Sequence, residues 1–142
     1  MNKDEKKDIN IKKNDELIIE IHDIGQQGEG IGKYKGYTLF VNNSTLGDKV
    51  KVKVMKTKKN YGFARLIEII EASPFRVNPK CKIADKCGGC SIQHINYEKQ
   101  LEIKQNRVIS CLERIAGFDL SYVEVALIIG MEDPYYYRNK VQ

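Results

Sequence analysis

Residues 50–54 read Val50-Lys-Val-Lys-Val54, a strict alternation of apolar and basic side chains. Successive side chains of a β-strand point to opposite faces of a sheet, so this pattern predicts a strand that buries its valines and exposes its lysines. Because such a strand needs partners to complete a core, the stretch predicts a sheet or barrel built with the sequence on either side of it.

Three further apolar runs supply those partners. Leu17–Ile21 and Tyr37–Val41 precede the alternating strand, Phe63–Ile70 follows it, and turn residues separate all of them. Short strands with regular turns are typical of a small all-β barrel. We therefore expect an OB-like β-barrel over residues 11–72, preceded by a charged, disordered tail over residues 1–10.

Four glycines in eight residues lie between the first two expected strands, at positions 25, 28, 30 and 32. Their spacing does not match the dinucleotide fingerprint G-x-G-x-x-G, and Gly32-Lys33 is not followed by the Ser or Thr of a phosphate-binding loop. We expect these glycines to serve β-bulges and tight barrel corners, and we expect no nucleotide site here.

Three cysteines lie within ten residues, Cys81, Cys87 and Cys90, with the spacing C-x5-C-G-G-C. The two glycines between the last two cysteines allow the backbone to take positive φ and to bring its N–H groups close to sulfur. Thiolates spaced this closely can converge on one metal centre, so we expect a metal loop over residues 73–96.

The identity of the metal is open between two chemistries. Iron–sulfur clusters are held by cysteines in glycine-bearing loops, often with one ligand from far along the chain, and the three cysteines favour this interpretation. Zinc would need a closed set of four ligands, which His94 could complete. Three unliganded thiols are the poorest interpretation, because free cysteines are usually buried singly.

A helix is expected after the cysteine loop, with Asn96 as its N-cap and Gly117 as its C-terminal stop. Apolar residues recur on one face of this helix, and Cys111 lies among them as a small buried side chain. Val123–Ile129 is expected to form a buried strand. The residues from Met131 onward look more like the beginning of another strand than like a natural terminus.

The expected fold class is therefore α+β. The barrel would be followed by the cysteine-rich metal loop, one long helix and the first strands of a second domain, which is incomplete within residues 97–142.

The net positive charge is concentrated in and just after the barrel, since residues 17–80 hold eleven Lys and Arg against six acids, and the whole chain carries +5. A localised basic surface predicts a polyanionic partner, and barrels of this kind bind RNA through charged grooves and aromatic stacking. A solvated strand face would explain the charge equally well. The expected RNA-binding residues lie on the outer strand face and at the turn after it: Lys49, Lys51, Lys53, Lys56, Lys58, Lys59 and Tyr61. Phe63 is expected to pack in the core, and Arg138 and Lys140 offer a second basic surface.

Several functions are not supported by the sequence. It shows no Ser/His/Asp arrangement, no paired carboxylates in an apolar setting and no cofactor-binding βαβ unit, so this chain alone is predicted to be inactive as an enzyme. It has no apolar run of the ~18 residues that suggest a transmembrane helix, and no secretory signal. We expect a cytoplasmic, monomeric protein with no membrane partner, in a compartment where thiols stay reduced.

The order of the motifs resembles the N-terminal part of a known enzyme family. The motifs are Gly28-Glu-Gly30-Ile-Gly32, Leu46-Gly47-Asp48, Ser73-Pro74-Phe-Arg76, Cys87-Gly-Gly-Cys90-Ser-Ile-Gln93-His94 and Tyr137-Arg138-Asn139-Lys140. Together with Cys81 they are similar to the RNA uracil-5 methyltransferases that carry a TRAM domain and a 4Fe-4S cluster, the type that makes 5-methyluridine in 23S ribosomal RNA.

The resemblance implies roles for individual residues. Cys81, Cys87 and Cys90 would be three cluster ligands, and the fourth ligand would come from beyond residue 142. The domain that binds S-adenosylmethionine and the catalytic residues would lie later still, so methyl transfer is implied for the parent protein. Residues 97–142 would begin its central RNA-recognition domain, and the partner would be structured RNA, specifically ribosomal RNA.

Two alternatives stay open. The chain could be a stand-alone RNA-binding protein that holds zinc or an iron–sulfur cluster and catalyses nothing. It could also belong with methylthio-transfer enzymes that use a TRAM barrel, but their cluster motif would be C-x3-C-x2-C, which differs from the spacing found here.

Overall fold

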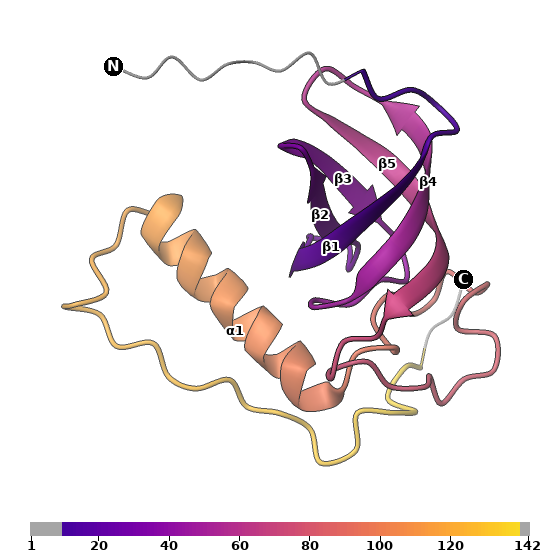
Figure 1. Cartoon of the computed structure of the whole chain (residues 1–142). Coiled ribbons are helices and arrows are strands. Elements are labelled where there is room, and N and C mark those ends of the chain that lie inside the picture. Colours follow the sequence, from indigo (N-terminus) through magenta and orange to yellow (C-terminus); the bar gives the residue numbers. More distant parts are fainter. Residues whose placement is uncertain (1–9, 140–142) are drawn as a thin grey trace, which may run out of the picture. The chain divides into compact units, whose positions relative to one another are not determined.

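The computed structural model describes residues 10–139, and the chain divides into two compact units between His94 and Ile95 (Figure 1). Each unit is described by itself. Residues 1–9 of the tail expected over residues 1–10 lie outside the described residues, and so does Lys140.

The first unit contains a closed five-stranded barrel (Figure 1). The strands are β1 (Glu16–Ile24), β2 (Gly30–Tyr34), β3 (Tyr37–Val41), β4 (Lys49–Thr57) and β5 (Tyr61–Glu71). They follow the order β1-β2-β3-β5-β4, and β4 pairs with β1 to close the barrel. Only the β3–β5 pair is parallel, and the barrel has the strand number and crossover of an OB-like fold. The predicted small barrel is confirmed.

The barrel core follows the predicted alternation. Val50, Val52 and Val54 of β4 are fully buried, whereas the lysines between them are partly exposed. The facing strands complete the core with Ile19, Ile21, Leu39, Val41 and Ala64. Since full burial of one valine side chain contributes ~1.5–3 kcal/mol to folding, this small set of residues supplies most of the driving force for the barrel.

One strand was not predicted, and it lies in the glycine segment. β2 contains Gly30 and Gly32, both buried, and a Cβ atom on Gly32 would lie 2.8 Å from the Glu20 carbonyl oxygen. These two glycines therefore allow close packing inside the barrel. The β1–β2 register shifts between Ile21 and Asp23 of β1, so this bulge is not formed by any of the four glycines.

The second unit contains helix α1 (Tyr97–Arg114). As predicted, the Asn96 side chain caps it by accepting a hydrogen bond from the Lys99 N–H at 2.8 Å. Gly117 has a φ of 70° just beyond the helix, in keeping with its predicted role as a stop.

Three expectations for this unit were wrong. Cys111 is exposed, because α1 has no buried residue on any face. Val123–Ile129 forms no strand, and Leu127 and Ile129 are 86% and 95% exposed. The segment near Arg138, where another strand was expected to begin, is also irregular and exposed. A strand needs a partner for its backbone groups, and α1 is the only regular element described in this unit.

A buried ion pair joins the barrel to the segment that leads into the cysteine loop. Asp48, just before β4, has no exposed surface, and its carboxylate accepts hydrogen bonds from the backbone N–H groups of Thr45 and Ser73 at 2.7 and 2.8 Å. The Arg76 guanidinium donates to both Asp48 carboxylate oxygens and to the Asn43 carbonyl oxygen. Four donors thus converge on one carboxylate.

These contacts set the ionisation of Asp48. Burial by itself would raise the pKa of this carboxyl, but the hydrogen bonds from Arg76, Ser73 and Thr45 outweigh it and leave the pKa below its usual value. The folded protein therefore holds Asp48 as an anion.

We predict that Arg76→Ala lowers the free energy of unfolding by about 3–5 kcal/mol, because it leaves the Asp48 carboxylate buried without its cation. Urea unfolding followed by circular dichroism measures this. Lys49→Ala, which removes a partner of the exposed residue Glu71, is the matched control and should have a far smaller effect. Equal losses of stability for the two variants would contradict the role given to Arg76.

The lowered pKa of Asp48 also predicts a pH dependence. A carboxyl whose folded pKa is below its ordinary value of 3.8 stabilises the fold above that pH, and this contribution is lost as the pH falls through the folded pKa. Asp48→Asn removes the titrating group, so the stability of the variant should fall less steeply with acid below about pH 5. If the free energy of unfolding falls equally steeply with acid in the unchanged protein and in Asp48→Asn, the pH dependence does not come from Asp48.

Candidate nucleic-acid interface and cysteine loop

The cysteine loop is closed at its base and attached to the barrel. The Val77 N–H donates to the His94 carbonyl oxygen at 2.9 Å, which joins the two ends of the loop. His94 is buried, and its Nε2 lies 3.0 Å from the Ser44 carbonyl oxygen at the end of the barrel. Burial lowers the pKa of the His94 imidazole, although the hydrogen bond to Ser44 opposes this shift. The neutral ring therefore acts here as a structural contact.

A glycine of the barrel supports the other flank of this loop. Gly28 has a φ of 89°, and a Cβ atom there would lie 2.8 Å from Ile92 Cγ2 and 2.9 Å from Ser91 Cβ. Only a residue without a side chain combines this backbone conformation with so close an approach. The segment just after Cys90 is thus packed directly against the turn before β2.

The three cysteines lie on turns and are all exposed. The N–H groups of Ala84 and Cys87 donate to the carbonyl oxygens of Cys81 and Ile83, so the backbone folds tightly between the first two cysteines. Over residues 10–139, no three Cys, His, Asp or Glu side chains are gathered closely enough to hold a metal ion. Neither Gly88 nor Gly89 is among the glycines with positive φ, so the loop does not use the freedom that these two glycines allow.

Two of the lysines expected to bind RNA are paired with acids on neighbouring strands. Lys49 Nζ lies 2.8 Å from Glu71 of β5, and Lys51 Nζ lies 2.8 Å from Glu16 of β1. Hydrogen bonds to these carboxylates raise the pKa of both lysines. The outer face of β4 therefore carries mixed charge, in contrast to a uniformly basic row.

Excess positive charge gathers at the far end of β4 and in the turn after it. Lys53 pairs in register with Arg65, and Lys56 pairs in register with Phe63. Within the described part of the chain, the structure gives no ion pair to the side chains of Lys56, Lys58 and Lys59. These three lysines are exposed beside Tyr61, so they form the part of the predicted surface with the least compensated charge.

Three aromatic rings cluster on the outside of the barrel next to these lysines. Phe40, Tyr61 and Phe63 have ring centroids 5.7–5.8 Å apart, and Tyr61 and Phe63 are 40% and 44% exposed. The expectation that Phe63 packs in the core was wrong. The small residues Gly62 and Ala64 face the interior instead, which turns Phe63 outward.

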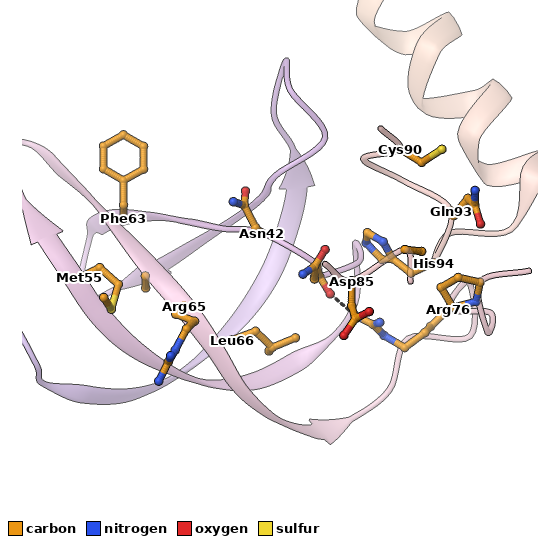
Figure 2. A pocket seen from close by; sticks show the side chains of 14 residues that line it. Asn42, Met55, Phe63, Arg65, Leu66, Arg76, Asp85, Cys90, Gln93 and His94 are labelled. Atoms are coloured by element: carbon orange, nitrogen blue, oxygen red, sulfur yellow. Dashed lines mark hydrogen bonds between the residues drawn. The ribbon is translucent and has the colours of Figure 1, made fainter. Parts of the chain in front are cut away.

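A groove begins at Phe63 and runs between the barrel and the cysteine loop, both within the first unit (Figure 2). Its volume is about 530 Å³, and its walls include Asn42, Met55 and Arg65 on one side and Cys90 and Gln93 on the other. The Arg76–Asn43 hydrogen bond, dashed in Figure 2, lies in the same lining. The groove thus combines amide, guanidinium and aromatic groups.

Sequence reasoning missed Phe40, Arg65 and the groove. Phe40 could have been found, because it alternates with Leu39 and Val41 and must face outward if those two residues face the core. The groove could not have been found, because it depends on how the loop folds back on β5. The second predicted surface consisted of Arg138 and Lys140. Of these two, only Arg138 lies within the described residues, and it is exposed in the second unit.

No helix among residues 10–139 is both long and apolar enough to cross a membrane.

Comparison with known proteins shows what this chain is similar to. Residues 11–67 match the family model described as TRAM domain. A protein of Clostridium acetobutylicum named as an uncharacterized RNA methyltransferase is 51% identical over 134 residues, which cover 94% of this chain and 29% of that protein. One of Listeria monocytogenes, also named as an uncharacterized RNA methyltransferase, is 46% identical over 93% of this chain and 28% of its own length.

Among solved structures, the Pyrococcus abyssi tRNA (uracil-54, C5)-methyltransferase is similar with 33% identity and a TM-score of 0.44, over 71% of this chain and 22% of that one. The chain spans less than a third of the length of the curated relatives it matches. Of the resemblance drawn from the motifs, the comparisons show a TRAM domain at residues 11–67 and similarity over almost the whole chain to proteins named RNA methyltransferases.

Proposed function

We propose that this chain is the RNA-binding N-terminal part of an S-adenosylmethionine-dependent RNA uracil-5 methyltransferase, with 23S ribosomal RNA as its substrate. The observation that carries the proposal is the similarity to proteins named RNA methyltransferases over 94% of the chain. The uracil-5 chemistry and the ribosomal target rest on the motif resemblance of the sequence. In this proposal the barrel binds the RNA, and methyl transfer belongs to the longer protein.

The charge distribution of the barrel supports RNA binding. Phosphate contacts need cations that are free to approach the backbone of the nucleic acid. All six predicted lysines lie on one strand and its turn, but Lys49 and Lys51 already face carboxylates. We therefore assign the larger share of phosphate contact to Lys56, Lys58 and Lys59, with Lys53 at the edge of this group.

We also propose that Cys81, Cys87 and Cys90 hold a 4Fe-4S cluster together with a fourth ligand from outside this chain. The chemistry of the donor set fits, because three exposed thiols lie on one short loop that is held at both ends by the barrel. The bound cluster would fix the three thiolates at one centre and so order the loop. Its role in this proposal is structural.

The lysine assignment predicts a salt-dependent effect. Lys56→Ala/Lys58→Ala/Lys59→Ala should weaken RNA binding and make the plot of log affinity against log salt shallower by about 0.7–0.9 for each phosphate that the variant no longer neutralises. Lys49→Ala/Lys51→Ala is the matched control and should change both quantities less. Fluorescence anisotropy of a labelled ribosomal RNA fragment at several salt concentrations measures them. If the control pair has the larger effect, the phosphates contact Lys49 and Lys51 at the other end of β4, and the lysine assignment is wrong.

The cluster assignment predicts that, of the four cysteines in this chain, only the three in the loop are needed to bind iron. Cys87→Ser should lose bound iron, whereas Cys111→Ser on helix α1 should keep it, because Cys111 lies outside the loop. Metal analysis of anaerobically purified protein, extended to the length of its relatives so that all ligands are present, measures this. Zinc in place of iron, or equal iron in both variants, would contradict the assignment.

A further inference from the structure

The three aromatic residues Phe40, Tyr61 and Phe63 pack together on the outside of the barrel, apart from its buried core. We call this set the aromatic platform. Phe40 and Phe63 face each other in register across the parallel β3–β5 pair, and Tyr61 lies beside Phe63 on the same strand. All three side chains point away from a core that Leu39, Val41 and Ala64 fill on the opposite face. Tyr61 and Phe63 are exposed and Phe40 is half-buried, and a cluster of large rings at the surface marks an interaction site.

The backbone beneath the platform is held in place before any partner arrives. The Tyr37 hydroxyl contacts the carbonyl oxygens of Lys58 and Tyr61 and accepts a hydrogen bond from the Lys58 N–H at 3.1 Å. A Cβ atom on Gly62 would lie 2.8 Å from the Lys56 carbonyl oxygen, so the two strands approach closely here. This packing orders the turn that carries the basic side chains next to the rings. Binding would therefore require little ordering of the protein.

Charge around the platform indicates the class of partner. Lys56 pairs in register with Phe63, Lys58 and Lys59 follow in the turn, and Arg65 lies two residues beyond Phe63. The groove that starts at Phe63 adds the amide groups of Asn42, Asn43 and Gln93, with Asp85 as the one acid in its lining. Its volume of about 530 Å³ lies within the range of small-molecule pockets, ~300–1,000 Å³. Aromatic rings and amides can bind the bases of nucleotides, and cations can bind their phosphates, so together these groups indicate a nucleotide partner.

The rings also indicate whether the bound nucleic acid is paired or unpaired. A protein can stack aromatic side chains only on bases whose faces are free, and in a duplex those faces are covered by neighbouring base pairs. Amide groups that hydrogen-bond base edges likewise need bases turned out of a helix. A duplex would use the lysines but leave the rings without a role.

We propose that the aromatic platform and the adjoining groove bind an unpaired segment of RNA, with its bases stacked on Phe40, Tyr61 and Phe63 and its phosphates near Lys56, Lys58, Lys59 and Arg65. This inference rests on the proposed RNA-binding function and adds the structural state of the RNA and the residues that read it. One base next to Phe63 enters the groove, where the amides of Asn42 and Gln93 face it.

The chain offers a direct spectroscopic test because it contains no tryptophan. Phe63→Trp places a single reporter on the platform. Ile67→Trp is the matched control, since Ile67 lies on the same strand and is 43% exposed, against 44% for Phe63, but belongs neither to the platform nor to the groove. Single-stranded hexauridylate should quench the Phe63→Trp emission in a saturable way and leave the Ile67→Trp emission nearly unchanged. A blunt RNA duplex should quench neither.

Affinity provides a second readout on the same positions. Phe63→Ala should weaken binding of labelled hexauridylate by about 5- to 100-fold, the range found when one base-stacking residue is removed, and Ile67→Ala should leave it within about twofold. Phe63→Tyr should retain affinity, because the ring is kept. Circular dichroism confirms that the variants keep the barrel.

The outcomes separate this inference from the function on which it rests. If RNA binds with a salt-dependent affinity but Phe63→Trp and Ile67→Trp respond alike, or if duplex RNA quenches as strongly as hexauridylate, the platform is not a site for unpaired bases and the RNA-binding function stands. If neither hexauridylate nor structured RNA binds, both the inference and the proposed function are overturned.

Discussion

The Asp48 carboxylate and the four N–H groups that donate to it hold the segment that leaves the barrel after β5. Asp48 lies between β3 and β4, while Ser73 and Arg76 lie after β5, so the ion pair joins segments that meet at one end of the barrel. A buried charge of this kind tolerates few alternative arrangements, because each would leave the carboxylate unpaired. The chain leaving β5 is therefore held in one direction, which determines where the cysteine loop begins. The hydrogen bond between His94 and Ser44 then holds the end of the loop at the same site.

The outer surface of the barrel divides its charges by position. Near the start of β4, lysines face glutamates of β1 and β5, and such exposed cross-strand pairs support the sheet register more than they attract a polyanion. Near the end of β4 the acids are replaced by Arg65 and by aromatic rings. The Lys-Val alternation ends at Val54, and Met55, Lys56 and Thr57 complete the strand, so the two ends of β4 differ in their surroundings. The lysines counted along the sequence therefore predicted a longer basic face than the structure has.

The parts of the fold that follow local rules could be predicted from the sequence. Alternation fixed the burial of Val50, Val52 and Val54, and the Asn96 cap fixed the start of the helix. The errors came where tertiary contacts decide the outcome. Phe63 is more apolar than Gly62 or Ala64, yet only small residues fit between Tyr37, Leu39 and the β4 backbone at that end of the barrel. Val123–Ile129 has the composition of a strand, but a strand forms only with a partner, and α1 is the only regular element described in its unit.

The cysteine loop and the proposed RNA site share a wall, and this suggests what ordering the loop achieves. Cys90 and Gln93 line the groove that starts at Phe63, while Ser91 and Ile92 between them pack on Gly28. A change in the path of the loop would therefore alter the groove without disturbing the barrel core, which is built from other residues. In the proposal above, a cluster bound by Cys90 would hold this wall in place. A group with no part in the chemistry of methyl transfer would then still affect RNA binding, through the shape of the groove.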